Sequence, residues 1–385
     1  MRKLLLFALL TLIACPAGAE PHRRALLIGI NDYTSARPVR PLLTDRDWPN
    51  LTGAANDVRM MEELLVLLYG FERKDIATLT NQQASRVAIV QALETLAAAA
   101  SKGDTVFFYF AGHGSQVRNT RSAEPDRLDE SIVPADSRAG ALDIRDKELR
   151  RVFNRILDRG ARLTVFLDSC HSGSGARGLP TGARPRGIAP DLRDVADSGD
   201  PGPSPEERGA LVLSASPDYE LAWEVTGDDG NRHGAFSWAF ARSIRAAAAG
   251  EPAMETFLRA QALLHGDRRY QDAVIGGGSE ATRNPFLGTR TDRRGERAIV
   301  AVERIRGDGT IELAGGWANG LSIGTELRID DLRLTVTRIN GLGRAHARVK
   351  SNVRQLPRAL AVGALAEVSG WAAPPGRPLR VWMPR

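Results

Sequence analysis

The sequence predicts an α/β protein with a mostly parallel central sheet, followed by a small all-β domain. Apolar runs of strand length alternate with segments of helical periodicity between residues 24 and 248. This alternation is typical of a parallel sheet that is covered by helices on both faces. From about residue 295 the segments become short, alternating and punctuated by glycine. That pattern favours a compact β-barrel or β-sandwich at residues 295–385.

The first elements of the α/β part follow in order. Residues 24–30 (RALLIGI) are expected to form a short buried strand, and residues 54–69 have the spacing of a helix. A second strand near 76–79 precedes a helix at 85–100. Its inward-facing residues are predicted to be Val87, Val90, Leu93 and Leu96.

Three further apolar runs have the length and composition of buried strands. They are 104–110 (DTVFFYF), 163–167 (LTVFL) and 209–216 (GALVLSAS), and a helix is expected at 234–248. Between Ser174 and Arg208 the chain is rich in Gly, Pro, Arg and Asp and has no hydrophobic period. A mobile loop is therefore expected at 174–208, inside an α/β domain that spans residues 23–290.

Bulk properties exclude several classes of protein. The chain has 385 residues and a formal net charge of +6, which is modest for this length and does not indicate a nucleic-acid partner. Zinc-type Cys/His spacing, a glycine loop for phosphate and interleaved basic and aromatic residues do not occur. No nucleic acid, cofactor or integral membrane span is therefore expected.

The first residues read as an export signal. Arg2 and Lys3 precede an apolar stretch that ends in Ala17-Gly18-Ala19, so a signal peptide at 1–19 and a periplasmic or secreted product are predicted. The alternative is a lipoprotein signal with lipid attached at Cys15, which Pro16 makes less attractive.

Cys15 and Cys170 are the two cysteines of the chain. Removal of the signal would leave Cys170 alone, without a partner for an internal disulfide.

Reactive side chains follow two of the predicted strands. The strand at 104–110 runs into AGHGSQ and the strand at 163–167 into DSCHSG. Active sites of parallel sheets form beyond the carboxyl ends of the strands. Cys170 needs a base to form its thiolate, and His113 is the predicted partner. His171 is excluded because successive side chains of a strand point to opposite faces.

The expected roles follow from this pairing. His113 acts as general acid and base, assisting the thiol and then protonating the leaving amine. The backbone N–H groups of Gly114 and Cys170 are predicted to form an oxyanion hole.

Together the two strand ends resemble one family, the metacaspases and bacterial caspase-like cysteine peptidases. The similarity rests on FFYFAGHGSQ and VFLDSCHSGSG and covers roughly residues 24–290. It extends to RALLIGINDY (24–33), LTGAANDVRMMEELL (51–65), DESIVPAD (129–136), LVLSASPDYELAWE (211–224) and HGAFSWAF (233–240). The resemblance implies a caspase-like three-layer α/β/α sandwich and a catalytic dyad at His113 and Cys170. Animal caspases carry their cysteine in a different pentapeptide.

The resemblance also implies an acidic primary (S1) pocket that accepts Arg or Lys. The matching positions are Asp57, in GAAND, and Asp168, two residues before the cysteine. A guanidinium between carboxylates offsets their repulsion. Without the resemblance, Asp57 could be a helix-start acid and Asp168 a strand-end residue that bonds to a turn. Two departures weaken the match, Ala111 and Ala54, where relatives often have Ser and Cys.

Calcium independence is expected. Some metacaspases bind calcium through aspartates, one of them seven residues after the cysteine, where this chain has Arg177. Asp126, Asp129 and Asp136 are interpreted instead as loop-capping or pocket-supporting residues.

Arg177, Arg184 and Arg186 make the following loop a candidate for self-cleavage, and a tolerated surface insertion is the equal alternative. Trp223 and Glu224 could line the substrate groove or be a core Trp beside a capped acid.

These observations favour an exported cysteine endopeptidase that cleaves proteins or peptides after Arg or Lys. One alternative is a catalytically idle caspase-like module that binds a protein partner, and another is a thiol acyl-transfer enzyme such as a transpeptidase. For the β domain at 295–385 a binding or positioning role is expected, with no partner identified.

Overall fold

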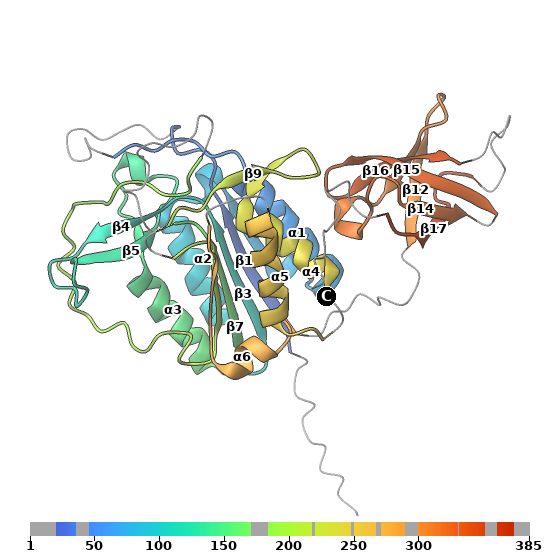
Figure 1. Ribbon diagram of the computed structural model, residues 1–385. Coiled ribbons are helices and arrows are strands. Elements are labelled where there is room, and N and C mark those ends of the chain that lie inside the picture. Colours follow the sequence, from blue (N-terminus) through green and yellow to red (C-terminus); the bar gives the residue numbers. More distant parts are fainter. Residues whose placement is uncertain are drawn as a thin grey trace, which may run out of the picture.

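The computed structural model consists of an α/β domain and a β-barrel that lies beside it (Figure 1). It describes residues 21–35, 46–170, 184–217, 220–247, 250–266, 271–288, 299–329, 331–350 and 360–372. Two features predicted from the sequence, the signal peptide at 1–19 and the self-cleavage candidate Arg177, lie outside these residues, as does His171.

A six-stranded sheet forms the centre of the α/β domain. Its strands are β1 (Arg23–Gly29), β2 (Ile76–Thr80), β3 (Thr105–Ala111), β7 (Arg162–Asp168), β8 (Leu211–Ser214) and β11 (Val274–Gly276). They lie in the order β11-β8-β7-β3-β1-β2, and only β11 is antiparallel to its neighbour. The predicted mostly parallel sheet is confirmed.

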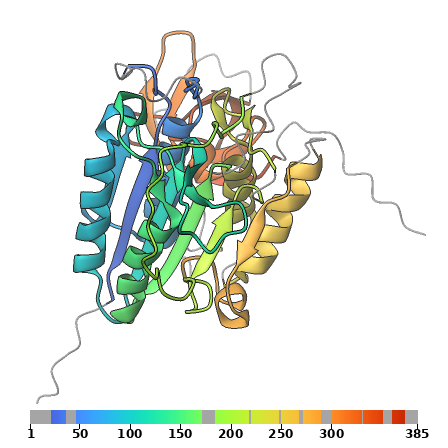
Figure 2. The same cartoon turned by 90° about the vertical axis from the view of Figure 1, so that its left-hand side faces the viewer.

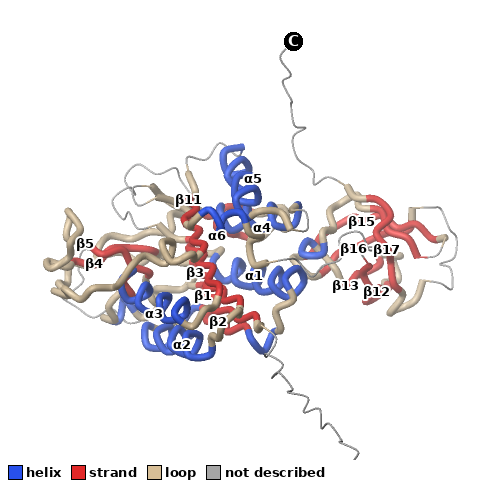
Figure 3. Tube along the Cα trace, turned by 90° about the horizontal axis from the view of Figure 1, so that it is seen from below, coloured by secondary structure: helices blue, strands red, loops and turns tan. Residues whose placement is uncertain are grey.

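Helices cover both faces of this sheet (Figures 2 and 3). One face carries α1 (Ala54–Tyr69), α4 (Ala235–Ala246) and α5 (Ala253–Gly266), and the other carries α2 (Arg86–Ala99) and α3 (Asp146–Asp158). The short α6 (Ser279–Arg283) follows β11.

Strand β3 illustrates why the central strands are apolar at successive positions. Phe107 and Tyr109 pack with the α1 and α4 side, and Phe108 and Phe110 pack with the α2 and α3 side. Because neighbouring side chains point to opposite faces and both faces are covered, every position of the strand is buried.

The inward face of α2 differs from the prediction at one position. Ile89, Leu93 and Leu96 are buried, whereas Val87 is 73% exposed. Val87 lies in the first turn after the N-cap Ser85, six residues before Leu93, and six residues rotate a helix by about 240°. The expectation that Val87 faces the core was wrong.

Two small sheets lie near the carboxyl ends of the main strands. One consists of β4 (Gly114–Arg118), β5 (Leu128–Ile132) and β6 (Ile144–Arg145), and the other is the hairpin of β9 (Glu224–Thr226) and β10 (Arg232–Gly234). Single turns of 3₁₀ helix occur at Arg73–Asp75, Asn81–Gln83, Ser137–Ala139 and Trp317–Asn319, the last labelled η5.

Within the described part of the expected mobile loop, residues 186–191 pack against the α/β domain, whereas most of residues 192–208 are exposed or half-buried. Arg186, Ile188 and Asp191 are all buried, and the backbone of this segment bonds to β4.

The carboxyl-terminal domain is a closed barrel with the order β12-β13-β16-β15-β14-β17. Its strands are β12 (Ile299–Ile305), β13 (Ile311–Ala314), β14 (Glu326–Ile329), β15 (Leu332–Asn340), β16 (Arg344–Val349) and β17 (Leu365–Gly370). Alternating apolar residues fill it. The barrel contacts the α/β domain through η5, whose Trp317 joins the core formed with α1 and α4.

In the part of the chain that the structure describes, no helix is long and apolar enough to cross a bilayer.

Candidate active site

The two strand ends singled out in the sequence are neighbours in the sheet. Strands β3 and β7 pair in parallel, and Ala111 lies opposite Asp168 at the end of the register. His113 and Cys170 each follow two residues later. The sheet therefore brings residues that are far apart in the sequence to the same edge, where a site is expected.

The predicted oxyanion-hole donors converge on one carbonyl oxygen. The backbone N–H groups of Gly114 and Cys170 both donate to the carbonyl oxygen of Arg186, with N···O distances of 2.9 and 3.0 Å. Position 114 has to be glycine, because a Cβ there would lie 2.3 Å from the carbonyl oxygen of Cys170. This pair of amides is spaced to hold one oxygen.

The imidazole of His113 is fixed by its surroundings. Its Nε2 lies 2.7 Å from the carbonyl oxygen of Pro49. A carbonyl only accepts, so Nε2 carries the proton and Nδ1 is the free acceptor. Among the described residues Nδ1 has no hydrogen-bond partner. Tyr33 packs against the ring at 4.7 Å between centroids, and its hydroxyl accepts the His113 backbone N–H at 2.9 Å.

Burial keeps both members of the predicted dyad neutral. The side chains of His113 and Cys170 are completely buried. Burial lowers the pKa of His113 to about 4, despite the hydrogen bond that His113 donates to the Pro49 carbonyl oxygen, and raises the pKa of Cys170 to about 12. At neutral pH the structure therefore holds a thiol and an uncharged imidazole.

Three buried carboxylates surround the guanidinium of Arg186. Its nitrogens lie 2.6 Å from Asp57, 3.2 Å from Asp168 and 3.3 Å from Glu224, and all four side chains have no exposed surface. Burial raises the pKa of Asp168, and the pKa of Arg186 is raised well above its ordinary value because the three carboxylates outweigh the effect of burial. The space that the Arg186 guanidinium fills between these three carboxylates is the acidic cavity.

Each carboxylate is held in place by further hydrogen bonds. Asp57 accepts the Gly234 N–H at 2.9 Å, and Asp168 accepts the Ser237 N–H at 3.0 Å. Glu224 accepts three N–H or O–H groups from the turn before α1, including the Gly53 N–H at 2.6 Å. Arg186 and these donors keep the pKa of Glu224 below its ordinary value although the residue is buried.

For two residues around this cavity, the sequence left the role open or gave no indication of it. Glu224 had two interpretations, and it lies in the acidic cavity. His233 was not assigned to the site, yet its Nδ1 lies 2.9 Å from Asp57 and its Nε2 lies 3.1 Å from Asp229. The motif HGAFSW was a signal for it, because Gly234 and Ser237 of the same motif bond to the carboxylates.

The structure describes two of the three self-cleavage candidates, and their side chains differ in exposure. Arg184 is exposed and its guanidinium donates to the carbonyl oxygen of Asn50 at 2.7 Å. Arg186 fills the acidic cavity.

The aspartates considered for calcium have other partners. Asp126 accepts the Leu128 N–H, and Asp136 accepts the Arg86 N–H at the start of α2. Asp129 is buried and bonds to Lys147, Arg145 and Asn119. Across the described residues, no group of three or more His, Cys, Asp or Glu side chains is arranged to hold a metal ion.

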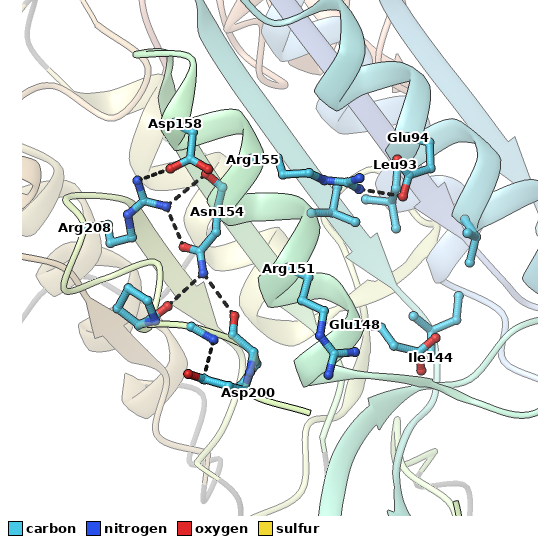
Figure 4. A pocket seen from close by; sticks show the side chains of 15 residues that line it. Leu93, Glu94, Ile144, Glu148, Arg151, Asn154, Arg155, Asp158, Asp200 and Arg208 are labelled. Atoms are coloured by element: carbon cyan, nitrogen blue, oxygen red, sulfur yellow. Dashed lines mark hydrogen bonds and ion pairs between the residues drawn. The ribbon is translucent and has the colours of Figure 1, made fainter. Parts of the chain in front are cut away.

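An open pocket of about 790 Å³ lies elsewhere, between α2, α3 and residues 200–208 (Figure 4). Two ion pairs join charged residues of its lining, Arg155 with Glu94 and Arg208 with Asp158. Neither strand end contributes to it.

The fold and the two strand ends define a caspase-like peptidase domain, and comparison with known proteins agrees. Residues 23–177 match the family described as "Metacaspase, peptidase C14 domain". Metacaspase-1 of Schizosaccharomyces pombe is 34% identical over 186 residues, which are 47% of this chain and 40% of that protein. Metacaspase-1A of Aspergillus niger is 31% identical over 267 residues, or 58% of this chain and 62% of that protein.

Residues 23–177 thus resemble the peptidase domain of metacaspases. The chain spans between two fifths and two thirds of the length of these curated relatives. A crystal structure of a Geobacter sulfurreducens protein has the same fold, with a TM-score of 0.50, 21% identity, and coverage of 70% of this chain and 99% of that chain.

Proposed function

We propose that the protein is a cysteine endopeptidase that hydrolyses peptide bonds after Arg or Lys, with His113 and Cys170 as its dyad. The observation that carries this proposal is the placement of Arg186. Its carbonyl oxygen meets the N–H groups of Gly114 and Cys170, while its side chain meets buried carboxylates. A peptide held in that way presents the bond after a basic residue to the thiol.

The first half of the reaction forms an acyl-enzyme. The sulfur of Cys170 attacks the carbonyl carbon and forms a C–S bond, while the thiol proton passes to Nδ1 of His113. The carbonyl electron pair moves to the oxygen, where the two N–H groups stabilise the charge. Collapse breaks the C–N bond, and His113 returns the proton to the leaving amine.

The second half releases the product. Water attacks the thioester carbon, and Nδ1 of His113 takes a proton from it. The C–S bond breaks, the proton returns from His113 to the sulfur, and the product leaves as a carboxylic acid that gives its remaining proton to solvent. Because the closed site favours the neutral pair, we infer that proton transfer accompanies attack rather than preceding it.

Specificity for basic residues follows from charge. A substrate guanidinium or ammonium would replace Arg186 among three buried carboxylates, whereas an acidic side chain would add a fourth negative charge. Cleavage after Asp is therefore disfavoured.

The test is a peptide assay with fluorogenic substrates that end in Arg, Lys or Asp. Wild type and Arg186→Lys are expected to cut the Arg and Lys substrates, and Cys170→Ala is expected to lose about 10³-fold or more. Ser169→Ala is the matched control, since the Ser169 hydroxyl has no hydrogen-bond partner among the described residues. Equal rates for wild type and Cys170→Ala would refute the proposal.

The same assay addresses the two alternatives. An idle scaffold would release no fluorophore with any variant. A transpeptidase would join the acyl group to an added amine nucleophile in preference to water, which mass spectrometry of the products distinguishes. We also propose export from the cell on the basis of the first 19 residues, which amino-terminal sequencing of the mature protein tests.

A further inference from the structure

The β-barrel is joined to the α/β domain by apolar side chains. Trp317 of η5 is only 5% exposed and belongs to the core that α1 and α4 form with the main sheet. Ile339, in the last turn of β15 around the barrel, and Leu342, just after β15, pack against the same core. Because burial of apolar surface stabilises such contacts, the barrel is held against the face of the sheet that carries α1 and α4.

Trp317 is one end of a series of stacked aromatic rings. Its indole lies on that of Trp238 in α4, with 4.3 Å between the centroids, and Trp238 lies on the imidazole of His233 at 4.6 Å. The planes are 20° apart in both pairs. The guanidinium of Arg245 lies 3.8 Å from the centroid of the Trp317 ring. Since cations are attracted to the faces of indole rings, Arg245 helps to hold Trp317 in this position.

His233 carries the series of contacts into the acidic cavity. Its Nδ1 lies 2.9 Å from Oδ1 of Asp57, and its Nε2 lies 3.1 Å from Asp229. A carboxylate only accepts hydrogen bonds, so both ring nitrogens donate and the ring is cationic. The Gly234 N–H donates to the other oxygen of Asp57, which lies 2.6 Å from the guanidinium of Arg186. The orientation of the Asp57 carboxylate is therefore set from β10, in which His233 and Gly234 are consecutive residues.

The turn between β9 and β10 closes against the edge of the stacked rings. A Cβ atom at Gly227 would lie 2.9 Å from Cζ2 of Trp238 and 3.0 Å from Cδ2 of His233. Both atoms belong to rings of the series, so even a methyl group at position 227 would displace them. The two rings are thus confined at their edge by Gly227, and Trp238 is covered by Trp317.

Building on the proposed function, we propose that Trp317 is a positioning residue for the acidic cavity, which makes the barrel a working part of the specificity site. Trp317 fixes the plane of Trp238, and Trp238 fixes the plane of His233. His233 in turn directs Asp57 at a basic side chain. Of the two roles expected for the domain at 295–385, binding and positioning, these contacts support positioning.

Kinetics with Arg-ended peptides test this role. Because Arg186 itself occupies the cavity, Trp317 variants are compared in the Arg186→Gln background, in which that guanidinium does not compete. Trp317→Leu is expected to raise KM severalfold with little change in kcat, since the cavity holds the substrate side chain and not the reacting bond. Trp317→Phe keeps a ring on Trp238 and is expected to restore KM.

The control makes the same substitution at another tryptophan of the barrel. Trp371 is 59% exposed and is not a member of the stack, so Trp371→Leu is expected to leave KM unchanged. An unchanged KM in Trp317→Leu, or an equal rise in both tryptophan variants, would overturn the proposal.

A double-mutant cycle identifies the residue through which Trp317 acts. Asp57→Asn removes the charge that His233 directs, so adding Trp317→Leu to Asp57→Asn is expected to raise KM little further. If the two substitutions raise KM independently, so that their effects on the binding free energy add, Trp317 does not act through Asp57 and the proposal fails.

A measurement without substrate, and with Arg186 in place, separates this proposal from the proposed function. The His233 ring lies on the face of Trp238, so the ring current of the indole displaces its NMR signals, which His233→Gln identifies in a chain with isotope-labelled histidine. Trp317→Leu is expected to shift these signals and to leave those of the exposed His265 unchanged.

The outcomes are distinct. Unchanged His233 signals in Trp317→Leu would refute the proposal whatever the activity of the chain. If the signals shift and no variant cuts any peptide, the proposed function fails while the coupling of the barrel to the cavity stands. Thermal melting checks that each variant is folded.

Discussion

The backbone nitrogen of Cys170 lies 3.0 Å from the carbonyl oxygen of Arg186, sixteen positions later in the chain. A buried N–H group needs an acceptor, and in this structure the protein supplies its own. The same residue places a guanidinium between Asp57 and Asp168. One segment thus satisfies both the amides and the carboxylates of the proposed substrate site.

The acidic cavity predicts how substitutions change substrate preference. Asp57→Asn removes one of the charges that contact the guanidinium, and loss of a buried charge partner costs about 2–5 kcal/mol. KM for an Arg-ended peptide is expected to rise about 30-fold or more, with a smaller change for an uncharged analogue.

Asp143→Asn is the control for this prediction. Asp143 is also buried and pairs with an arginine, Arg46, at 2.5 Å, but it lies outside the cavity. Its replacement is expected to lower stability and leave the ratio of Arg to uncharged substrates unchanged. A similar change of that ratio in both variants would contradict the assignment.

The reactivity of Cys170 depends on whether Arg186 is in place. Burial raises the pKa of the thiol to about 12, and only the thiolate is alkylated readily. His113→Gln should leave the chain uncut and be alkylated slowly by iodoacetamide at pH 8. The double variant with Arg186→Gln is expected to react several times faster because water reaches the sulfur. Equal rates, measured by mass spectrometry, would show that the segment does not shield the thiol.

His233 predicts a pH dependence of stability. Burial lowers its pKa, but hydrogen bonds and charges from Asp229 and Asp57 outweigh burial and raise the pKa to about 9. Because the folded pKa exceeds the ordinary value of about 6.5, protonation stabilises the fold below pH 6.5. This contribution, about 2–3 kcal/mol, is lost as the pH rises from 6.5 to 9.

Denaturant unfolding at several pH values measures this effect. His233→Gln is expected to flatten the fall in stability between pH 6.5 and 9, and His265→Gln, at an exposed position, is expected to keep it. A fall that persists in His233→Gln would assign the pH dependence to other groups.

Calcium is expected to have no effect on peptide cleavage. Burial raises the pKa of Asp129, but hydrogen bonds from Lys147, Asn119, Ser122 and Arg145 hold it below its ordinary value. Both oxygens of Asp129 are thus occupied by protein donors, two of which are cationic. Rates in chelator and in added calcium should agree within error. Activation by calcium would require these ion pairs to open.

The sequence was sufficient for the features that repeat or that stand at strand ends. Hydrophobic periodicity predicted how strands and helices alternate along the chain. That alternation indicated a parallel sheet, because both faces of such a sheet must be covered by helices. The ends of β3 and β7 pointed to His113 and Cys170, because the carboxyl edge of such a sheet is where side chains of different strands meet.

Other features depended on contacts that leave no local pattern. Burial of Arg186 arises from three carboxylates on α1, β7 and β9, which only the fold brings together. The contact of Trp317 with Trp238 joins segments far apart in the chain. Val87 is apolar, as a core residue would be, but it lies on the side of its helix that faces solvent.

By itself, therefore, the sequence predicted the α/β architecture, a small all-β domain and the reactive residues at two strand ends, since periodicity and residue type are local properties, whereas closure of the small domain into a barrel was decided by the fold. Which arginine fills the acidic cavity, and how the barrel reaches that cavity, was decided by tertiary structure. Hydrogen bonds and ion pairs between distant segments depend on where the backbone places their atoms.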